Sequence, residues 1–184
     1  QDLNILNNVL AELKNTDIES SIVLKSTVLP SGIQKIENLF PEIVYNPEFL
    51  TEKNSVNDFI NADQIILGGK VDNTSKISLF YKKHTKCITN NYIFTDLITA
   101  SFVKYAINCF LASKVIFFNE LNQLFVNSDT KEKWENFLDI ISSDSRIGDS
   151  HMQVPGPDGR YGFGGACFPK DAEAFYKYSV LMES

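Results

Sequence analysis

The sequence predicts an α/β protein in two parts, a first part that alternates helices and strands and a second part that is all helical. Residues 1–90 switch between apolar residues at helical spacing and short apolar runs closed by Gly, Pro or Asn, which indicates a parallel or mixed sheet covered by helices. Residues 95–126 contain neither Gly nor Pro, so one long helix is expected there. We therefore divide the chain into residues 1–92 and 93–184.

The elements of the first part follow from local patterns. Leucines recur at helical spacing over residues 3–14 and predict a first helix. Three short apolar runs, each closed by Pro, Asn-Pro or Gly-Gly, predict buried strands at residues 21–26, 43–45 and 64–67. Further helices are expected at residues 33–40 and 74–83, and a short strand at 86–89.

The second part is dominated by its long helix, which would extend roughly 45 Å at 1.5 Å per residue. Such a helix, apolar over much of its circumference, usually packs against more than its own small domain. A second helix is expected at residues 131–141, followed by a Gly- and Pro-rich loop over 148–165. A last helix should begin near Pro169, because Pro is favoured in the first helical turn.

Composition and charge narrow the class of protein. The formal net charge of −6 argues against nucleic acid or an anionic membrane as the main partner, since both need an excess of Lys and Arg. Cys87, Cys109 and Cys167 match no zinc spacing, and the two histidines lie far apart, so no metal site is expected. An odd number of cysteines without a disulfide pattern favours a reducing compartment and hence a cytoplasmic protein.

No membrane or export segment is expected. The apolar stretches are interrupted by Lys, Asn or Glu, so we expect none long enough to span a bilayer. The first residues have neither a basic start nor an apolar core, unlike a signal peptide. The chain also does not begin with Met, which suggests a fragment or a processed chain.

The segment Gly162-Phe-Gly-Gly-Ala-Cys167-Phe-Pro-Lys-Asp171 is the most unusual in the chain. Its glycines let the backbone approach a ligand closely, and Cys167 directly precedes the last expected helix. The positive end of a helix and the neighbouring Lys170 both stabilise a thiolate, while Asp171 in the first turn could hold a water. The alternative is a small packed cysteine and a capping aspartate. A dinucleotide fingerprint is excluded, because no strand precedes the segment and the third glycine is missing.

Lys104 and Asn108 lie four residues apart on the long helix and so share one face. Their neighbours are apolar, and a buried ammonium is costly unless it meets a charge or a developing oxyanion. A lysine that extends its amine to the surface is the simpler interpretation in isolation.

Polar residues also follow two expected strands. Thr27 comes after the first strand, and Glu48 and Glu52 lie four apart after the second. Ligands bind at the carboxyl ends of strands in open sheets, although a helix cap and a solvated turn explain these residues as well. Arg146, in Arg-Ile-Gly, suits phosphates or sugar hydroxyls, but a lone surface arginine is usually just solvated.

Each of these segments alone is weak evidence for a function, but their combination in this order is specific. The chain contains, in order, Lys25-Ser-Thr-Val-x-Pro-Ser-Gly32, Asn46-Pro-Glu-Phe-Leu-x-Glu52, Lys104-Tyr-Ala-x-Asn-x-Phe-Leu-Ala-x-Lys114 with Asn119-Glu120 beyond, Arg146-Ile-Gly148 and Gly162-Phe-Gly-Gly-x-Cys-Phe-Pro-Lys-Asp171. This series resembles that of the UDP-glucose/GDP-mannose dehydrogenases. The resemblance implies the C-terminal part of a Rossmann-like NAD-binding domain, followed by an all-α central dimerisation domain with one long helix.

The resemblance also implies an activity. The expected reaction is the NAD-dependent four-electron oxidation of a nucleotide-sugar primary alcohol to a uronic acid, with UDP-glucose to UDP-glucuronate as the foremost example. By that analogy Cys167 forms a thiohemiacetal and then a thioester, Lys104 and Asn108 stabilise oxyanions, and Asp171 serves water and proton transfers. Glu52 and Thr27 would hold water near the cofactor and the reacting carbon.

Other positions would bind the ligands. The expected substrate-binding residues are Glu48, Phe49, Leu50, Arg146, Phe163 and Gly164, with Arg146 reaching the substrate of the neighbouring subunit, and the cofactor-binding residues are Thr27, Glu52 and Lys170. The family's Gly-x-Gly-x-x-Gly turn and its C-terminal domain have no counterpart in this sequence, so the chain alone is expected to be inactive. The alternative is a truncated relative that serves as a helical dimerisation module.

Overall fold

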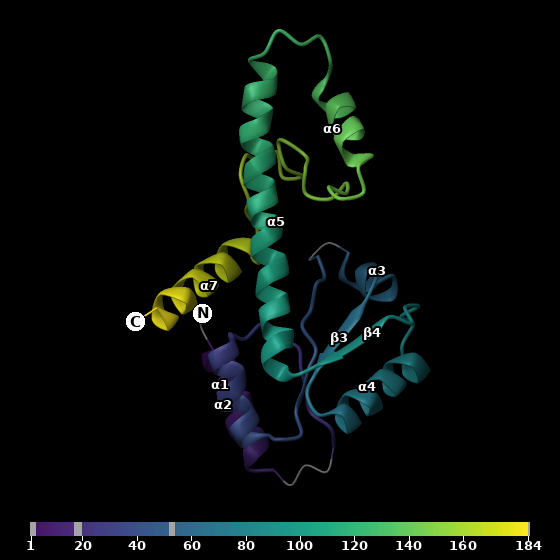
Figure 1. Cartoon of the computed structure of the whole chain (residues 1–184). Helices are drawn as coiled ribbons and strands as arrows, with labels where there is room; N and C mark the ends of the chain where they lie inside the picture. Colours follow the sequence, from purple (N-terminus) through teal and green to yellow (C-terminus); the bar gives the residue numbers. More distant parts are fainter. Residues whose placement is uncertain (1–2, 17–19, 52–53, 184) are drawn as a thin grey trace. The chain divides into compact units, whose positions relative to one another are not determined.

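The computed structural model describes residues 3–16, 20–51 and 54–183, and the chain forms two compact units, residues 1–105 and 106–184. The first unit is built on a four-stranded sheet in the order β1 (Val23–Leu24), β2 (Val44–Tyr45), β3 (Ile65–Gly68) and β4 (Tyr92–Thr95). β1 and β2 are parallel, β2 and β3 antiparallel, and β3 and β4 parallel. The sheet is therefore mixed, and its strands β3 and β4 lie side by side in Figure 1.

In the described part of the first unit, the sheet is accompanied by helices α1 (Asn4–Lys14), α2 (Pro30–Leu39), α3 (Ser55–Ile60) and α4 (Val71–His84). Successive strand residues point to opposite faces, so Tyr45 belongs to one apolar core and Val44 to the other. The first core joins the sheet to α1 and α2 through Leu10 and Ile33. The second joins it to α4 through Ile77, so helices cover both faces, as the alternating pattern predicted.

The long helix α5 (Leu97–Val126) starts against this sheet. Leu97 and Ala100 lie in the first core, and the Ser101 hydroxyl donates a hydrogen bond of 2.6 Å to the Val28 carbonyl. β3 approaches α5 so closely that a Cβ at Gly68 would lie 2.7 Å from the Cβ of Ala100. Glycine is therefore required where the strand meets the helix.

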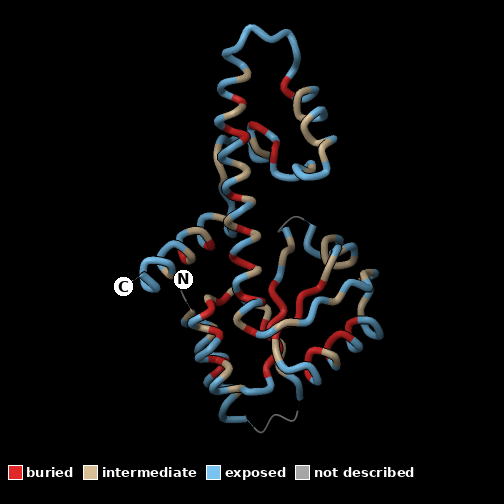
Figure 2. The backbone as a smooth tube through the Cα atoms, viewed as in Figure 1, coloured by how far each residue is buried: buried red, intermediate tan, exposed pale blue. Residues whose placement is uncertain are grey.

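The second unit contains the rest of α5 with α6 (Trp134–Ser142) and α7 (Phe168–Met182). Its core is an aromatic cluster in which the ring of Phe125 lies 5.5 Å from that of Trp134 and 4.6 Å from that of Phe137. Met152 and Val154 of the following loop are buried in the same cluster. Much of α6 and of the loops remains exposed, as Figure 2 shows.

Most expected elements are present, with two corrections. The predicted strand at residues 86–89 is wrong: Ile88 is 68% exposed, and the strand forms instead at β4, where it pairs with β3. Helix α3 was not predicted, because six residues carry too short a pattern to recognise. In the described residues after 95 every regular element is a helix, as expected.

The length of α5 also corrects an expectation. By length and composition alone it is apolar enough to cross a membrane, with a mean hydropathy of 1.4 in its most apolar window, 33% of which is buried. The prediction that no apolar segment is long enough to span a bilayer is therefore wrong. Core helices pass the same test, and the buried Asn108 and Asn119 side chains of α5 are hydrogen-bonded to protein groups.

Candidate active site

Cys167 is exposed and occupies the N-cap position of α7, with Pro169 in the first turn. Its carbonyl accepts the first helical hydrogen bond, 2.9 Å from the Asp171 amide. Gly162 and Gly165 before it have φ values of 77° and 76°, which favour glycine. The sequence thus places a thiol at the positive end of a helix, after a turn that other residues would strain.

Asn108 of α5 and Asp171 of α7 form a buried pair. The Asn108 Nδ2 donates a hydrogen bond of 2.6 Å to Asp171 Oδ2, and the two residues are 6% and 1% exposed. The other carboxylate oxygen, Oδ1, accepts no hydrogen bond from the described residues, but the Lys170 ammonium lies 2.9 Å away as an ion pair. Both oxygens therefore face a polar group, which compensates for burying a charge.

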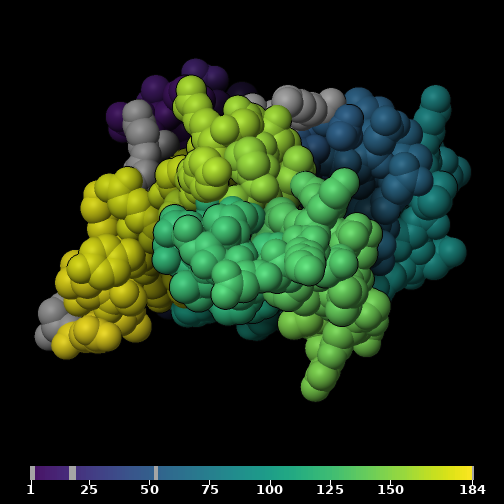
Figure 3. Space-filling model, turned by 90° about the horizontal axis from the view of Figure 1, so that it is seen from above, coloured from purple at the N-terminus to yellow at the C-terminus, as the bar shows by residue number. Residues whose placement is uncertain are grey.

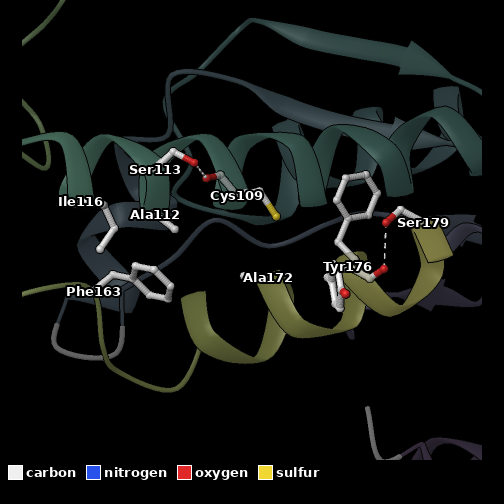
Figure 4. A pocket seen from close by; sticks show the side chains of 9 residues that line it. Cys109, Ala112, Ser113, Ile116, Phe163, Ala172, Tyr176 and Ser179 are labelled. Carbon is white, nitrogen blue, oxygen red and sulfur yellow. Dashed lines mark hydrogen bonds between the residues drawn. The ribbon is translucent and has the colours of Figure 1, made fainter.

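A groove of about 460 Å³ lies between α5 and α7 beside this pair. The Cys109 thiol points into it from α5, opposite Tyr176 and Ser179 of α7 (Figure 4). Burial, and then the charge of Asp171, raise the pKa of the Cys109 thiol. Phe163 reaches the same groove from the glycine-rich loop, so this predicted sugar-site residue lies against α5 and α7.

Lys104 is buried in the first unit, at 6% exposure. Its ammonium donates a hydrogen bond to the Glu48 carbonyl and lies 4.8 Å from the centre of the Phe49 ring. The interpretation of Lys104 as a surface lysine is therefore wrong. The structure instead joins it to the segment that contains the predicted substrate residues Glu48, Phe49 and Leu50.

The strand ends of the first unit gather further polar groups. Because β1 and β2 are parallel, their carboxyl ends lie at one edge of the sheet, and there Lys25 Nζ lies 3.4 Å from Glu48 Oε2. Thr27 is half-buried just beyond β1. Asn46 is fixed between the Ile66 carbonyl and the Tyr81 hydroxyl, both 2.9 Å away. Glu52 lies outside the described residues.

Arg146 is exposed in the loop between α6 and α7. Its guanidinium binds the Asp144 carboxylate with three contacts of 2.5–3.2 Å, and this pairing lowers the pKa of Asp144. Asp144 was not among the predicted site residues, since a pairing two residues apart carries no sequence signal. Convergence of Lys104 with Cys167 remains a prediction, because the two residues belong to different units.

The comparisons with known proteins agree with these motifs. Residues 1–85 match the NAD-binding domain of the UDP-glucose/GDP-mannose dehydrogenase family, and residues 98–180 match the family's central domain. The chain belongs to this family. Residues 1–85 thus belong to the family's NAD-binding domain, which is Rossmann-like, and NAD is the cofactor of that domain.

Individual relatives are similar over most of this chain. UDP-glucose 6-dehydrogenase of Rickettsia bellii is 39% identical over 160 residues, which cover 82% of this chain and 34% of that protein. The Campylobacter jejuni enzyme of the same name is 34% identical over 178 residues, 94% of this chain and 42% of that protein. A solved UDP-glucose dehydrogenase from Pyrobaculum islandicum superposes with a TM-score of 0.79 at 29% identity, over 99% of this chain and 43% of that one. The chain thus spans about a third of its Rickettsia relative's length.

The residues present fit part of an NAD site. The parallel strands β1 and β2 bring hydroxyl, ammonium and carboxylate groups of Thr27, Lys25 and Glu48 to one edge of the sheet, where ligands of such sheets bind. A Gly-x-Gly-x-x-Gly turn that would hold the pyrophosphate is not part of this sequence. Only the side chains at the ends of β1 and β2 are therefore compared with an NAD site.

Proposed function

We propose that this chain is the catalytic-cysteine part of an NAD-dependent nucleotide-sugar 6-dehydrogenase, which oxidises a primary alcohol to a uronic acid. The observation that carries the proposal is the exposed Cys167 at the start of α7, one turn from the buried Asn108–Asp171 pair. UDP-glucose is the proposed substrate, because the relatives from Rickettsia bellii and Campylobacter jejuni are named for it.

The covalent steps belong to Cys167. NAD, when bound, would supply the hydride acceptor for both oxidations. The Cys167 sulfur bonds to the aldehyde carbon and holds it as a thiohemiacetal, which becomes a thioester once oxidised. One water then cleaves the carbon–sulfur bond, releases the carboxylic acid and returns the thiol.

The surrounding groups stabilise charge and move protons. Lys104 and Asn108, four residues apart on α5, would donate to the oxyanion that forms on the sugar carbon. The Asp171 carboxylate is held by Asn108 and Lys170, and this orientation suits a group that directs the hydrolytic water. Thr27 and Glu52 would hold water near the cofactor. Lys170 would lie beside the cofactor.

By the family resemblance, Glu48, Phe49 and Leu50 after β2, and Phe163 and Gly164 of the glycine-rich loop, would contact the sugar. Arg146, exposed and held by Asp144, would reach the substrate of the neighbouring subunit.

We also propose a homodimer built on α5, in the cytoplasm and without nucleic-acid or membrane partners. The exposure of large apolar side chains on α5 supports this assembly: Phe110 is 68% exposed, Phe117 60% and Leu124 71%. Isolated apolar residues are normal on a surface, but several on one helix mark an interaction face. A monomer in light scattering at high micromolar concentration would overturn the dimer.

Turnover by the complete enzyme tests the proposed chemistry. Cys167→Ser should abolish uronic-acid formation while nucleotide-sugar binding persists, since a serine hydroxyl is a far weaker nucleophile than a thiolate. Lys104→Ala should slow every step that builds charge on the sugar oxygen by roughly 10²- to 10³-fold. The assay follows NADH release from UDP-glucose and related nucleotide sugars. Wild-type acid formation by Cys167→Ser would refute the proposed role of Cys167. A complete wild-type protein without any turnover would instead favour the helical dimerisation module.

A further inference from the structure

The loop between α6 and α7 carries two residues of the proposed chemistry, Arg146 near its start and Cys167 at its end. Two side chains of α5 hold it. The Lys114 ammonium donates hydrogen bonds to the carbonyl oxygens of Ile147 and Gly148, at 2.9 and 3.3 Å. These carbonyls directly follow Arg146, so Lys114 fixes the backbone from which the arginine projects.

Asn119 holds the other end of the loop. Its Nδ2 donates to the Val115 carbonyl at 2.8 Å within α5, which orients the amide so that Oδ1 faces the loop. That oxygen accepts the Gly162 N–H at 2.8 Å, and Asn119 is only 6% exposed. Gly162 opens the turn that ends at Cys167, so this one buried amide defines where the turn begins.

Lys114 and Asn119, the two anchors of the loop, bind separate stretches of its backbone. Between them the loop closes on itself, because the Gly156 amide donates to the Arg160 carbonyl and the Gly159 amide to the Gly156 carbonyl, both at 2.8 Å. In Figure 3 the yellow-green surface of the loop lies against the green surface of α5, as these contacts require. Loss of one anchor should therefore leave the other in place.

We propose that Lys114 and Asn119 are two independent positioning residues, Lys114 for Arg146 and Asn119 for the turn that carries Cys167. This inference rests on the proposed function, which assigned neither residue a role. It predicts that the two anchors affect different kinetic parameters. A reacting group displaced by about 1 Å can lose roughly 10²-fold in rate, so small shifts of the loop are measurable.

The kinetic experiment uses the complete enzyme. Asn119→Ala should lower kcat for acid formation from the nucleotide-sugar aldehyde by roughly 10- to 100-fold, with KM for the nucleotide sugar within about 3-fold of wild type. Lys114→Met should raise that KM by roughly 10-fold with kcat little changed, and Lys114→Arg should restore it, because a guanidinium can still donate to both carbonyls.

Matched controls separate positioning from general destabilisation. Asn122→Ala removes an equally buried amide, 8% exposed, from the same helix, and Lys131→Met removes an exposed charge. Neither should reproduce either kinetic change. The proposal is overturned if Asn119→Ala and Lys114→Met alter the same parameter, if Asn122→Ala matches Asn119→Ala, or if neither variant changes turnover.

Hydrogen exchange on this 184-residue chain provides a readout that needs no catalysis. Asn119→Ala should speed exchange in the peptide around Gly162, and Lys114→Met only in the peptide around Gly148, whose amide is bonded to the Asp144 carbonyl. Local exchange changes without any dehydrogenase turnover would reject the proposed function but keep the anchors. Turnover with exchange changes spread over the whole unit would reject the anchors alone.

Discussion

The buried pair of Asn108 and Asp171 gives the sharpest test of the helical unit. Asn108→Ala removes the amide that donates to Asp171 Oδ2 at 2.6 Å and leaves a carboxylate, 1% exposed, beside the Lys170 ammonium. A hydrogen bond to a charged group contributes about 1.5–3 kcal/mol, and an unsatisfied buried acceptor adds a desolvation cost. We expect the free energy of unfolding to fall by about 2–3 kcal/mol.

The chain supplies its own matched control. Asn136 in the first turn of α6 donates to Glu132 Oε2, just before the helix, at 3.0 Å; the groups are again an amide and a carboxylate, but they are exposed. Asn136→Ala should leave the free energy of unfolding unchanged within error, because water replaces an exposed hydrogen bond.

The single tryptophan makes the measurement specific to this unit. Trp134 is 8% exposed within the aromatic cluster, so its fluorescence reports unfolding of residues 106–184. Urea titration of the wild type, Asn108→Ala, Asp171→Ala and the double variant yields the coupling energy of the pair, expected at about 1.5–3 kcal/mol. A coupling energy near zero, or equal losses for Asn108→Ala and Asn136→Ala, would refute the buried pair.

Three further outcomes are expected. Gly68→Ala should destabilise the first unit by about 1–3 kcal/mol, because the added Cβ would collide with α5. Gly164→Ala should not destabilise the protein, because a Cβ added there meets nothing within 4 Å. Thermal melting followed by circular dichroism compares the two variants. Burial raises the pKa of Tyr81, so its contribution to the free energy of unfolding should be complete below the ordinary tyrosine pKa of about 10. That contribution should be lost as the pH rises through the raised pKa. Tyr81→Phe should reduce this alkaline loss, as urea titrations at successive pH values would measure. Iodoacetamide at pH 8 should alkylate half-buried Cys109, whose pKa burial raises, more slowly than exposed Cys167, as peptide mass spectrometry would show; equal rates would contradict the groove geometry.

Local signals explain which parts of the fold were predictable. The long helix, the start of α7 and three of the four strands depend on neighbouring residues, such as a run without Gly or Pro or a Pro in the first turn. β4 was misplaced because the last strand was expected at residues 86–89 and the long helix from residue 95, so residues 92–94 were assigned to neither. Only its pairing with β3 distinguishes it.

The candidate site could be predicted only as a set of residues. Asn108 and Asp171 are 63 positions apart in the sequence. No spacing indicates that the Asn108 amide would donate a hydrogen bond to the Asp171 carboxylate. The same holds for Lys104, whose partner is a backbone carbonyl 56 positions away. Family motifs identify such residues, but tertiary packing decides their partners.

Helix α5 connects these observations physically. Lys104 belongs to the first unit and Asn108 to the second, yet both lie on one unbroken helix. Their separation is four residues, about 6 Å of rise at 1.5 Å per residue, and it is fixed by the helix itself. Because Lys114 and Asn119 extend from the same helix to the loop before Cys167, a single helix spaces the proposed oxyanion donors and anchors the nucleophile's loop. A break in α5 between Ser101 and Asn119, such as a proline, should therefore cost more activity than the loss of any one of these side chains.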